Sequence, residues 1–189
     1  MKLRILPIIL LLLLIPIKTF ADAPEISYGQ STFNFLKGYY ILKDNVTFSM
    51  NNGGFKGTIR ADEAKISLIT QKCLATGKVA LTHESMNLTC EEAFASFNEK
   101  NVIVAGNVKF DSKENLKITA DKATYDWGAR VADFYGKVKI KPEKNFSADK
   151  NLNPKETYAH VRYNVETNKI IQLDKNFDSS KIVIPDFES

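Results

Sequence analysis

The chain has 189 residues, with 26 lysines and arginines against 22 aspartates and glutamates. At this length one domain can bury a substantial core. The formal net charge is +4, but three basic residues, Lys2, Arg4 and Lys18, lie within the first 23 residues, and without them the charge is about +1. Such a balanced chain lacks the basic excess typical of nucleic-acid-binding proteins, so we expect no nucleic-acid partner.

Residues 1–23 have the layout of a secretory signal peptide. Two basic residues precede an apolar run, residues 5–17, and small residues follow at Ala21 and Ala23. The run of about 13 residues is shorter than the roughly 20 needed to cross a bilayer as a helix. We therefore predict a leader that is cleaved after Ala21 or Ala23, with residues 24–189 exported as one domain. An uncleaved membrane anchor is the alternative.

After the leader, two short phrases recur with a period of 29 or 30 residues. A glycine phrase reads CLATGKVALT, NVIVAGNVKF and ADFYGKVKI, and its glycines are Gly77, Gly106 and Gly136. An acid phrase reads IRADEAKIS, LTCEEAFAS and ITADKATYD with the same spacing. Two landmarks that share one period indicate a tandem repeat architecture.

The repeat is less regular at its two ends. In ILKDNVTFS, Asp44 stands where the first glycine would be. A fourth acid phrase is either FSADK (146–150) or TYAHVRY (157–163), and the register is ambiguous there. The part of the domain after residue 141, with Pro142 and Pro154, is accordingly expected to be less regular.

Apolar and polar residues alternate within the phrases, which is typical of strands with one buried face. In each acid phrase the buried parity reverses, which predicts a bulge or corner at Asp62–Glu63, Glu91–Glu92 and Asp121–Lys122. Each unit is then two strands and two turns. The sequence predicts an all-β fold, an elongated antiparallel sandwich or roll whose two end strands are open edges.

No catalytic constellation is present, and we expect neither an enzyme nor a cofactor. The two histidines, His83 and His160, lie far apart and match no metal-ligand spacing. The acids Asp62, Glu91 and Asp121 recur once per repeat, whereas calcium loops need several oxygen ligands close together in sequence. We interpret them as residues that cap the bends.

Cys73 and Cys90 both fall on the buried parity, and an even cysteine count in an exported chain suggests a disulfide. However, a hairpin that turns near Glu84 places Cys73 opposite about residue 95. An offset of five residues is about 16 Å along a strand, whereas bonded cysteines need Cα atoms within about 7 Å. The bond would require the bend to fold one strand over the other, so the pairing is left open.

The buried stripe is the candidate binding surface. It forms either a filled core or an apolar groove suited to acyl chains, and the sequence favours neither. Its members are Phe48, Ile59, Val79, Leu81, Leu88, Val108, Phe110, Ile118, Val138 and Ile140.

The alternation of GKV, GNV and GKV with ADEA, CEEA and ADKA resembles the OstA-like family, over roughly residues 38–165. The family includes the periplasmic bridge of the lipopolysaccharide transport machinery. The resemblance implies a slightly twisted, open antiparallel β-jellyroll that shelters lipid A acyl chains in its interior. It also implies head-to-tail self-association through strand edges, an anchored inner-membrane jellyroll subunit and an outer-membrane translocon as partners, and no catalytic residues.

On this resemblance we expect a periplasmic lipopolysaccharide-binding carrier that bridges the inner and outer membranes in outer-membrane assembly. Two alternatives remain open. One is an envelope scaffold with a filled core that pairs through its strand edges and binds no lipid. The other is a membrane-anchored jellyroll subunit of the same pathway, which would keep its leader.

Overall fold

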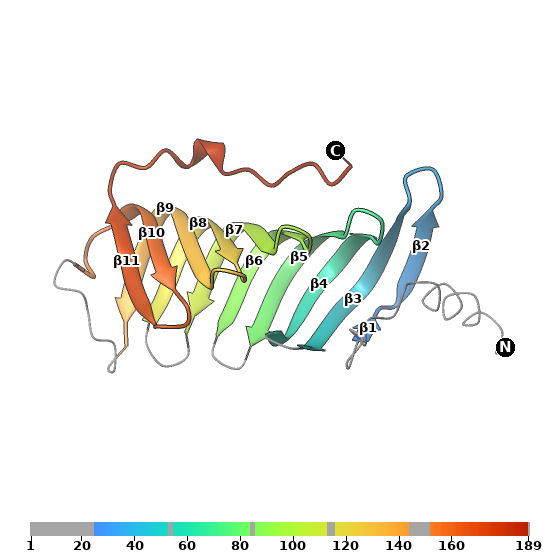
Figure 1. Cartoon of the computed structure of the whole chain (residues 1–189), viewed down its shortest axis with the longest axis horizontal. Coiled ribbons are helices and arrows are strands. Elements are labelled where there is room, and N and C mark those ends of the chain that lie inside the picture. The colour runs from blue at the N-terminus through green and yellow to red at the C-terminus, as the bar shows by residue number, and fades with distance from the viewer. Residues whose placement is uncertain (1–24, 53–54, 84–85, 113–115, 144–151, 189) are drawn as a thin grey trace.

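A computed structural model describes residues 25–52, 55–83, 86–112, 116–143 and 152–188. The expected leader and the FSADK phrase lie outside these ranges. Within them the protein is almost entirely β-structure, arranged along one long axis (Figure 1). In the described ranges, no helical segment has the length and apolar character needed to span a lipid bilayer.

The strands form a single antiparallel sheet in which nearly every strand pairs with its neighbours in the chain. The short β1 and β2 both pair with β3 and share one edge of the sheet, and β11 is the other edge. The expectation of an open antiparallel all-β fold is therefore confirmed. The elements are β1 (Glu25–Ser27), β2 (Gln30–Asn34), β3 (Tyr39–Asn52), β4 (Phe55–Ser67), β5 (Lys72–His83), β6 (Asn87–Ser96), β7 (Asn101–Asp111), β8 (Leu116–Asp126), β9 (Val131–Pro142), β10 (Tyr158–Asn164), β11 (Lys169–Asp174) and the 3-10 helix η1 (Ser179–Lys181).

The register shifts at the middle of each long strand, and this shift is the corner expected from the acid phrases. Between β7 and β8, Ala105 pairs with Lys122 and Val108 pairs with Ala120, so β7 holds two unpaired residues and β8 holds one, Asp121. Two unpaired residues leave the buried parity of β7 unchanged, whereas one unpaired residue reverses the parity of β8. The parity reversal in the acid phrases is thus explained.

The glycine phrase and the acid phrase are the two sides of this corner. Gly106 has a φ of 81° and Asn107 has a φ of 47°, a left-handed pair that bends β7 sharply. A Cβ on Gly106 would lie 2.4 Å from Oε2 and 2.7 Å from Cβ of Glu91 on β6. Each repeat therefore packs an acidic side chain directly against a glycine, in the pairs Asp62 with Gly77, Glu91 with Gly106 and Asp121 with Gly136.

The two irregular ends of the repeat keep the corner with different residues. Asp44 and Asn45 form the left-handed pair of β3, with φ of 66° and 57°. At this corner the acid itself is in the left-handed pair, and the glycine lies on the neighbouring segment. A Cβ on Gly29 would lie 2.7 Å from Cβ of Asp44. At the other end TYAHVRY forms β10, and the register shift against β9 leaves Ala159 in the place of the acid.

The corners divide the sheet into two layers that face each other across the interior. Phe110 of β7 contacts both Phe134 of β9 and Tyr163 of β10, with ring centroids 5.3 Å and 5.7 Å apart. Since β7 pairs with neither β9 nor β10, these contacts cross from one layer to the other. The lower layer is residues 46–52, 55–61, 79–83, 86–90, 108–112, 116–120 and 138–142, and the upper layer is residues 39–43, 63–67, 72–76, 92–96, 101–105, 122–126, 131–135 and 160–164.

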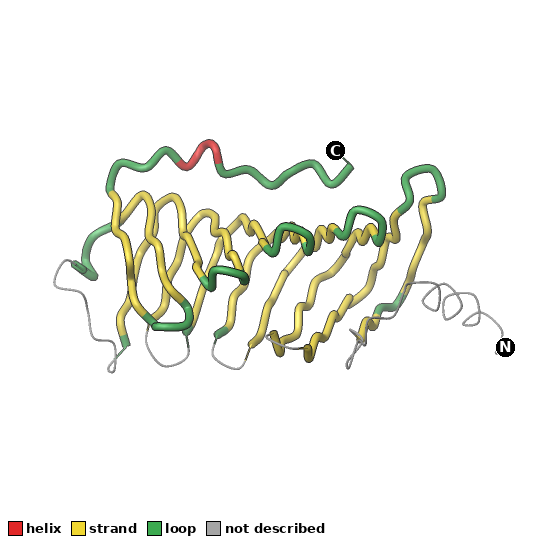
Figure 2. Tube along the Cα trace, in the orientation of Figure 1, coloured by secondary structure: helices red, strands yellow, loops and turns green. Residues whose placement is uncertain are grey.

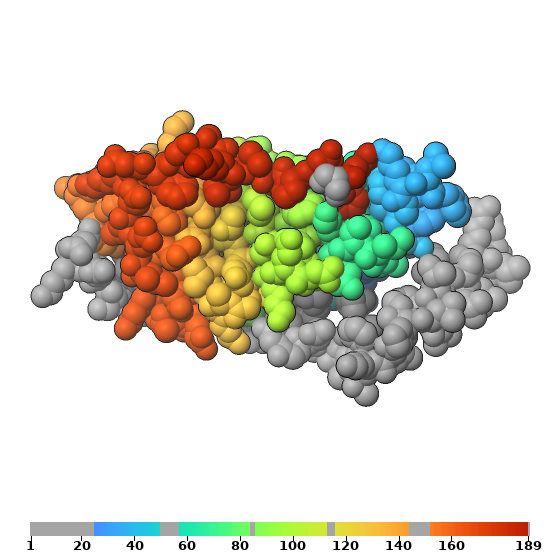
Figure 3. All heavy atoms as spheres, turned by 45° about the horizontal axis from the view of Figure 1, so that its top comes forward, coloured from blue at the N-terminus to red at the C-terminus, as the bar shows by residue number. Residues whose placement is uncertain are grey.

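The segment after β11, residues 175–188, runs back over the upper layer without joining the sheet (Figures 2 and 3). Phe187 is buried at its far end and stacks edge-on against Tyr39 of β3, with centroids 5.2 Å apart. Glu188 accepts a hydrogen bond from the Tyr39 hydroxyl at 2.9 Å and pairs with Lys37. The segment thereby connects the β11 edge to the opposite end of the sheet.

We predict that Gly106→Ala lowers the free energy of unfolding by about 2 kcal/mol or more. An alanine is strained at this left-handed φ, and its Cβ would collide with the Glu91 side chain. Gly128→Ala is the control, since its φ is not left-handed and its Cβ would meet only the ends of two side chains, Oδ1 of Asp126 at 3.2 Å and Cδ of Lys100 at 3.5 Å. We expect a change within about 0.5 kcal/mol for the control. Denaturant unfolding measures both, and equal losses would contradict the corner model.

Candidate functional site

An apolar cavity of about 70 Å³ lies between the two layers. Leu81 and Leu88 line it from the lower layer, and Ala75, Ala93 and Ala95 line it from the upper layer. Leu81, Leu88 and Ala95 remain partly exposed, so the cavity opens to solvent. Such a cavity can hold a flexible hydrocarbon group by burial of apolar surface, without requiring any directional contact.

The structure brings together five of the ten stripe residues around this cavity: Ile59, Val79, Leu81, Leu88 and Phe110. Four others, Val108, Ile118, Val138 and Ile140, are at most 2% exposed and belong to the packed core instead. Phe48 lies outside both, half-buried on β3, with its ring 6.5 Å from that of Phe97. Both expected arrangements therefore occur, in different parts of the interior. Residues of β7 to β9 fill one part, and residues from β4 to β9 line the cavity. That the stripe binds lipid remains a prediction.

The upper layer supplies lining residues that the stripe did not include. Its small side chains, Ala75, Ala93, Ala95, Ala123 and Ala132, leave the free volume of the cavity. They fall on the buried parity of their strands, so the alternation pattern could have identified them. Larger apolar residues such as Val102, Tyr125 and Phe134 complete the lining on this side.

The disulfide left open by the sequence is not formed, and both cysteines are free thiols. Cys73 pairs with Ala95 and Cys90 pairs with Val79 in the β5–β6 ladder, so the hairpin offset holds the two apart. Cys73 lines the cavity and Cys90 lies in the core. Burial raises the pKa of each thiol to about 12.

A polar cluster on the outer face of the upper layer was missed by the sequence analysis. Asp133 is only 7% exposed and accepts hydrogen bonds from His160 Nε2 at 2.7 Å and from Arg162 Nε at 2.8 Å. The hydrogen bonds to Asp133 raise the pKa of Arg162. The rings of Tyr135 and Phe177 cover His160, with centroids 5.0 Å and 4.8 Å away. We interpret the cluster as a set of contacts that holds β9, β10 and the C-terminal segment together.

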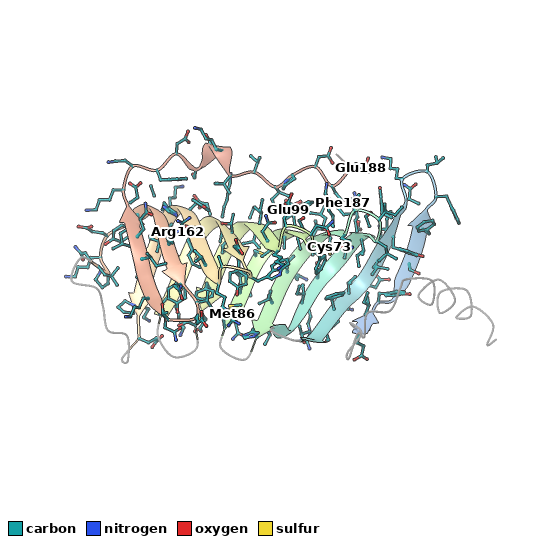
Figure 4. All side chains as sticks on the ribbon, viewed as in Figure 1. Cys73, Met86, Glu99, Arg162, Phe187 and Glu188 are labelled. Carbon is teal, nitrogen blue, oxygen red and sulfur yellow. The ribbon has the colours of Figure 1, made fainter. Side chains whose placement is uncertain are left out.

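Residues that could hold a metal do not gather in the described ranges, where no group of three or more histidine, cysteine, aspartate or glutamate side chains is suitably placed. The recurring acids Asp62, Glu91 and Asp121 each lie at a separate corner against a glycine. That these acids cap the bends remains a prediction. Figure 4 shows that Cys73 and Met86, two lining residues, project into the interior between the layers, while Arg162 lies near the β11 end.

The family model for OstA-like proteins matches residues 58–182, well over half of the chain. The chain belongs to the OstA-like family. No curated protein matches its sequence. Among solved structures, it is similar to LptH of Pseudomonas aeruginosa, described as the LptA homologous periplasmic component of the lipopolysaccharide transport device. That similarity has 7% identity and a TM-score of 0.48, and covers 70% of this chain and 92% of LptH.

We predict that both thiols of this OstA-like protein react very slowly with iodoacetamide at pH 8, because their raised pKa leaves almost no thiolate. In denaturant they should react at the rate of ordinary thiols, at least a hundredfold faster. Mass spectrometry of the alkylated chain over time measures both rates. Rapid alkylation of the native protein, or a mass two hydrogens lower, would contradict the free and buried assignment.

Proposed function

We propose that this OstA-like protein is a periplasmic carrier that binds the acyl chains of lipopolysaccharide between its two layers and passes them from the inner to the outer membrane. The observation that carries the proposal is the apolar cavity between the layers, lined from both sides and partly open to solvent. Family membership supports the same role. The protein would act by binding alone, as a non-enzymatic carrier with no cofactor.

The size of the cavity indicates how binding would proceed. Its volume of about 70 Å³ has room for about five water molecules, which is less than a complete acyl chain. The layers must therefore move apart to admit one. They are joined at the corners. Near β5 and β6 the upper layer contributes mainly alanines to the interior, so few contacts resist separation there.

The two free edges of the sheet support a bridging role. Among the strands that the structure describes, β1 and β2 pair only with β3, and β11 pairs only with β10. Each edge therefore offers backbone groups to another strand. We propose that copies join head to tail through these edges, with an anchored inner-membrane jellyroll subunit at one end and the outer-membrane translocon at the other.

We propose that the leader directs export and is cleaved, which places the mature domain in the periplasm. The anchored subunit of the same pathway differs only in keeping residues 1–23. The intact mass of the isolated protein distinguishes the two forms directly.

We predict that a photoreactive residue in place of Leu88 crosslinks to lipopolysaccharide, because the Leu88 side chain lines the cavity. The matched control is Thr89, the next residue, which is exposed on the opposite face of β6. The ratio of lipid crosslink at the two positions should be at least ten. Equal crosslinking, or none at Leu88, would reject the carrier.

We also predict that a photoreactive residue in place of Ile171 on β11 yields a covalent dimer of the mature chain, because Ile171 is 56% exposed on a free edge strand. Lys109, exposed on the face of β7, is the control and should yield none. The products are separated by denaturing electrophoresis. A dimer at Ile171 without any lipid crosslink at Leu88 would favour the scaffold, which the packed core around β8 to β10 supports.

A further inference from the structure

Five turns of the upper layer share one backbone geometry and so provide an internal comparison. They are residues 35–38, 68–71, 97–100, 127–130 and 165–168, and each ends in a residue with left-handed φ, between 54° and 68°. Because the geometry is the same, the turn itself does not determine which side chains occupy the earlier positions.

The first two turns differ from the other three in those positions. At the second position Leu36 is 99% exposed and Ile69 is 83% exposed. The same position holds Asn98, Gly128 and Glu166 in the later turns.

At the first position Phe35 is 86% exposed and Leu68 is 52% exposed. The corresponding Phe97 and Trp127 are half-buried and contact each other, with ring centroids 6.1 Å apart. Neither turn geometry nor core packing therefore accounts for the exposed apolar residues of the first two turns.

These four side chains form one surface, the apolar tip: Phe35, Leu36, Leu68 and Ile69. The two turns touch, since a Cβ on Gly38 would lie 3.5 Å from Cδ1 of Ile69. Figure 1 shows both turns on the same upper side of the molecule, at the end that carries β1 and β2. Contiguous exposed apolar surface of this kind marks an interaction site.

We propose that the apolar tip inserts into the surface of a lipid bilayer. Its side chains are exposed at the ends of hairpin turns and form no pocket, which suits a fluid hydrocarbon layer that needs no matching pockets. The turns contain Lys37 and no acidic residue, so an anionic surface does not repel them, although Lys37 is paired with Glu188. Apolar burial is then the main driving force, with little contribution from charge.

The course of the chain also favours a membrane over a protein partner. Glu25, the first described residue, begins β1 at this end of the molecule. The preceding residues include the apolar run 5–17, so the end with the apolar tip is the one that emerges beside the membrane during export. The apolar tip is separate from the cavity, and the inference goes beyond the carriage of lipopolysaccharide.

The test is flotation of the mature chain with vesicles of phosphatidylethanolamine and phosphatidylglycerol, and with vesicles of phosphatidylcholine. We expect binding to both, and at least a tenfold loss of the bound-to-free ratio in the double variant Leu36→Ser with Ile69→Ser. The control is Glu166→Ser, at the same position of a polar turn, and it should bind like the unaltered chain. Thermal melting confirms that both variants are folded.

A second measurement locates the contact. Leu36→Cys is labelled with an environment-sensitive fluorophore, since Cys90 is buried and Cys73 is half-buried and burial raises the pKa of both thiols. Its emission should shift to the blue with vesicles, whereas a label on Glu166→Cys, at the same position of a polar turn, should not shift. Absence of vesicle binding, equal binding by the Leu36 and Ile69 variant, or photocrosslinking of Ile69 to protein rather than lipid in isolated envelopes would each overturn the proposal. Lipopolysaccharide crosslinking from Leu88 should persist in that variant, so failure here is distinguishable from failure of the carrier.

Discussion

The close packing of an acidic side chain against a glycine at each corner is the constraint on which the architecture depends. A long strand that stayed straight would form a flat sheet with no interior. The left-handed pair at Gly106 and Asn107 bends β7, and the single unpaired residue on β8, Asp121, lets the next strand follow the bend. Because successive repeats contain the same register shift, the bends align along the sheet. One sheet thereby forms two facing layers.

The interior created in this way is not uniform, because residue size differs along the sheet. Toward β8 to β10 the large side chains of Phe134 and Tyr163 are fully buried and meet Phe110 of the opposite layer across the gap. Toward β5 and β6 the upper layer contributes alanines, and the gap stays partly empty. A packed end gives the fold its stability, while a loosely filled region can exchange protein contacts for contacts with a hydrocarbon guest. The difference between the packed region and the loosely filled region follows from side-chain volume alone.

Much of this could be predicted from the alternation of residues, because strand parity is a local property. It predicted the corners, the antiparallel repeat and the pairing of Cys73 opposite about residue 95, which the structure shows with Ala95. The features that it missed depend on contacts between distant parts of the chain. Three of these features become visible only in the folded layers. They are the contact between Gly29 and Asp44, the cluster around Asp133, and the division of the stripe residues between core and cavity. The exposure of Leu36 likewise becomes meaningful only by comparison with equivalent turns.

The course of residues 175–188 has a practical consequence for work with this protein. Since Phe187 and Glu188 lie against Tyr39 and Lys37, the carboxyl end of the chain is beside the hairpin of β2 and β3, far from β11 (Figure 4). A reporter or purification tag fused there would be located next to the amino-terminal edge. Distances measured from such a fusion would describe that edge, and a bulky tag would obstruct it while leaving the β11 edge accessible.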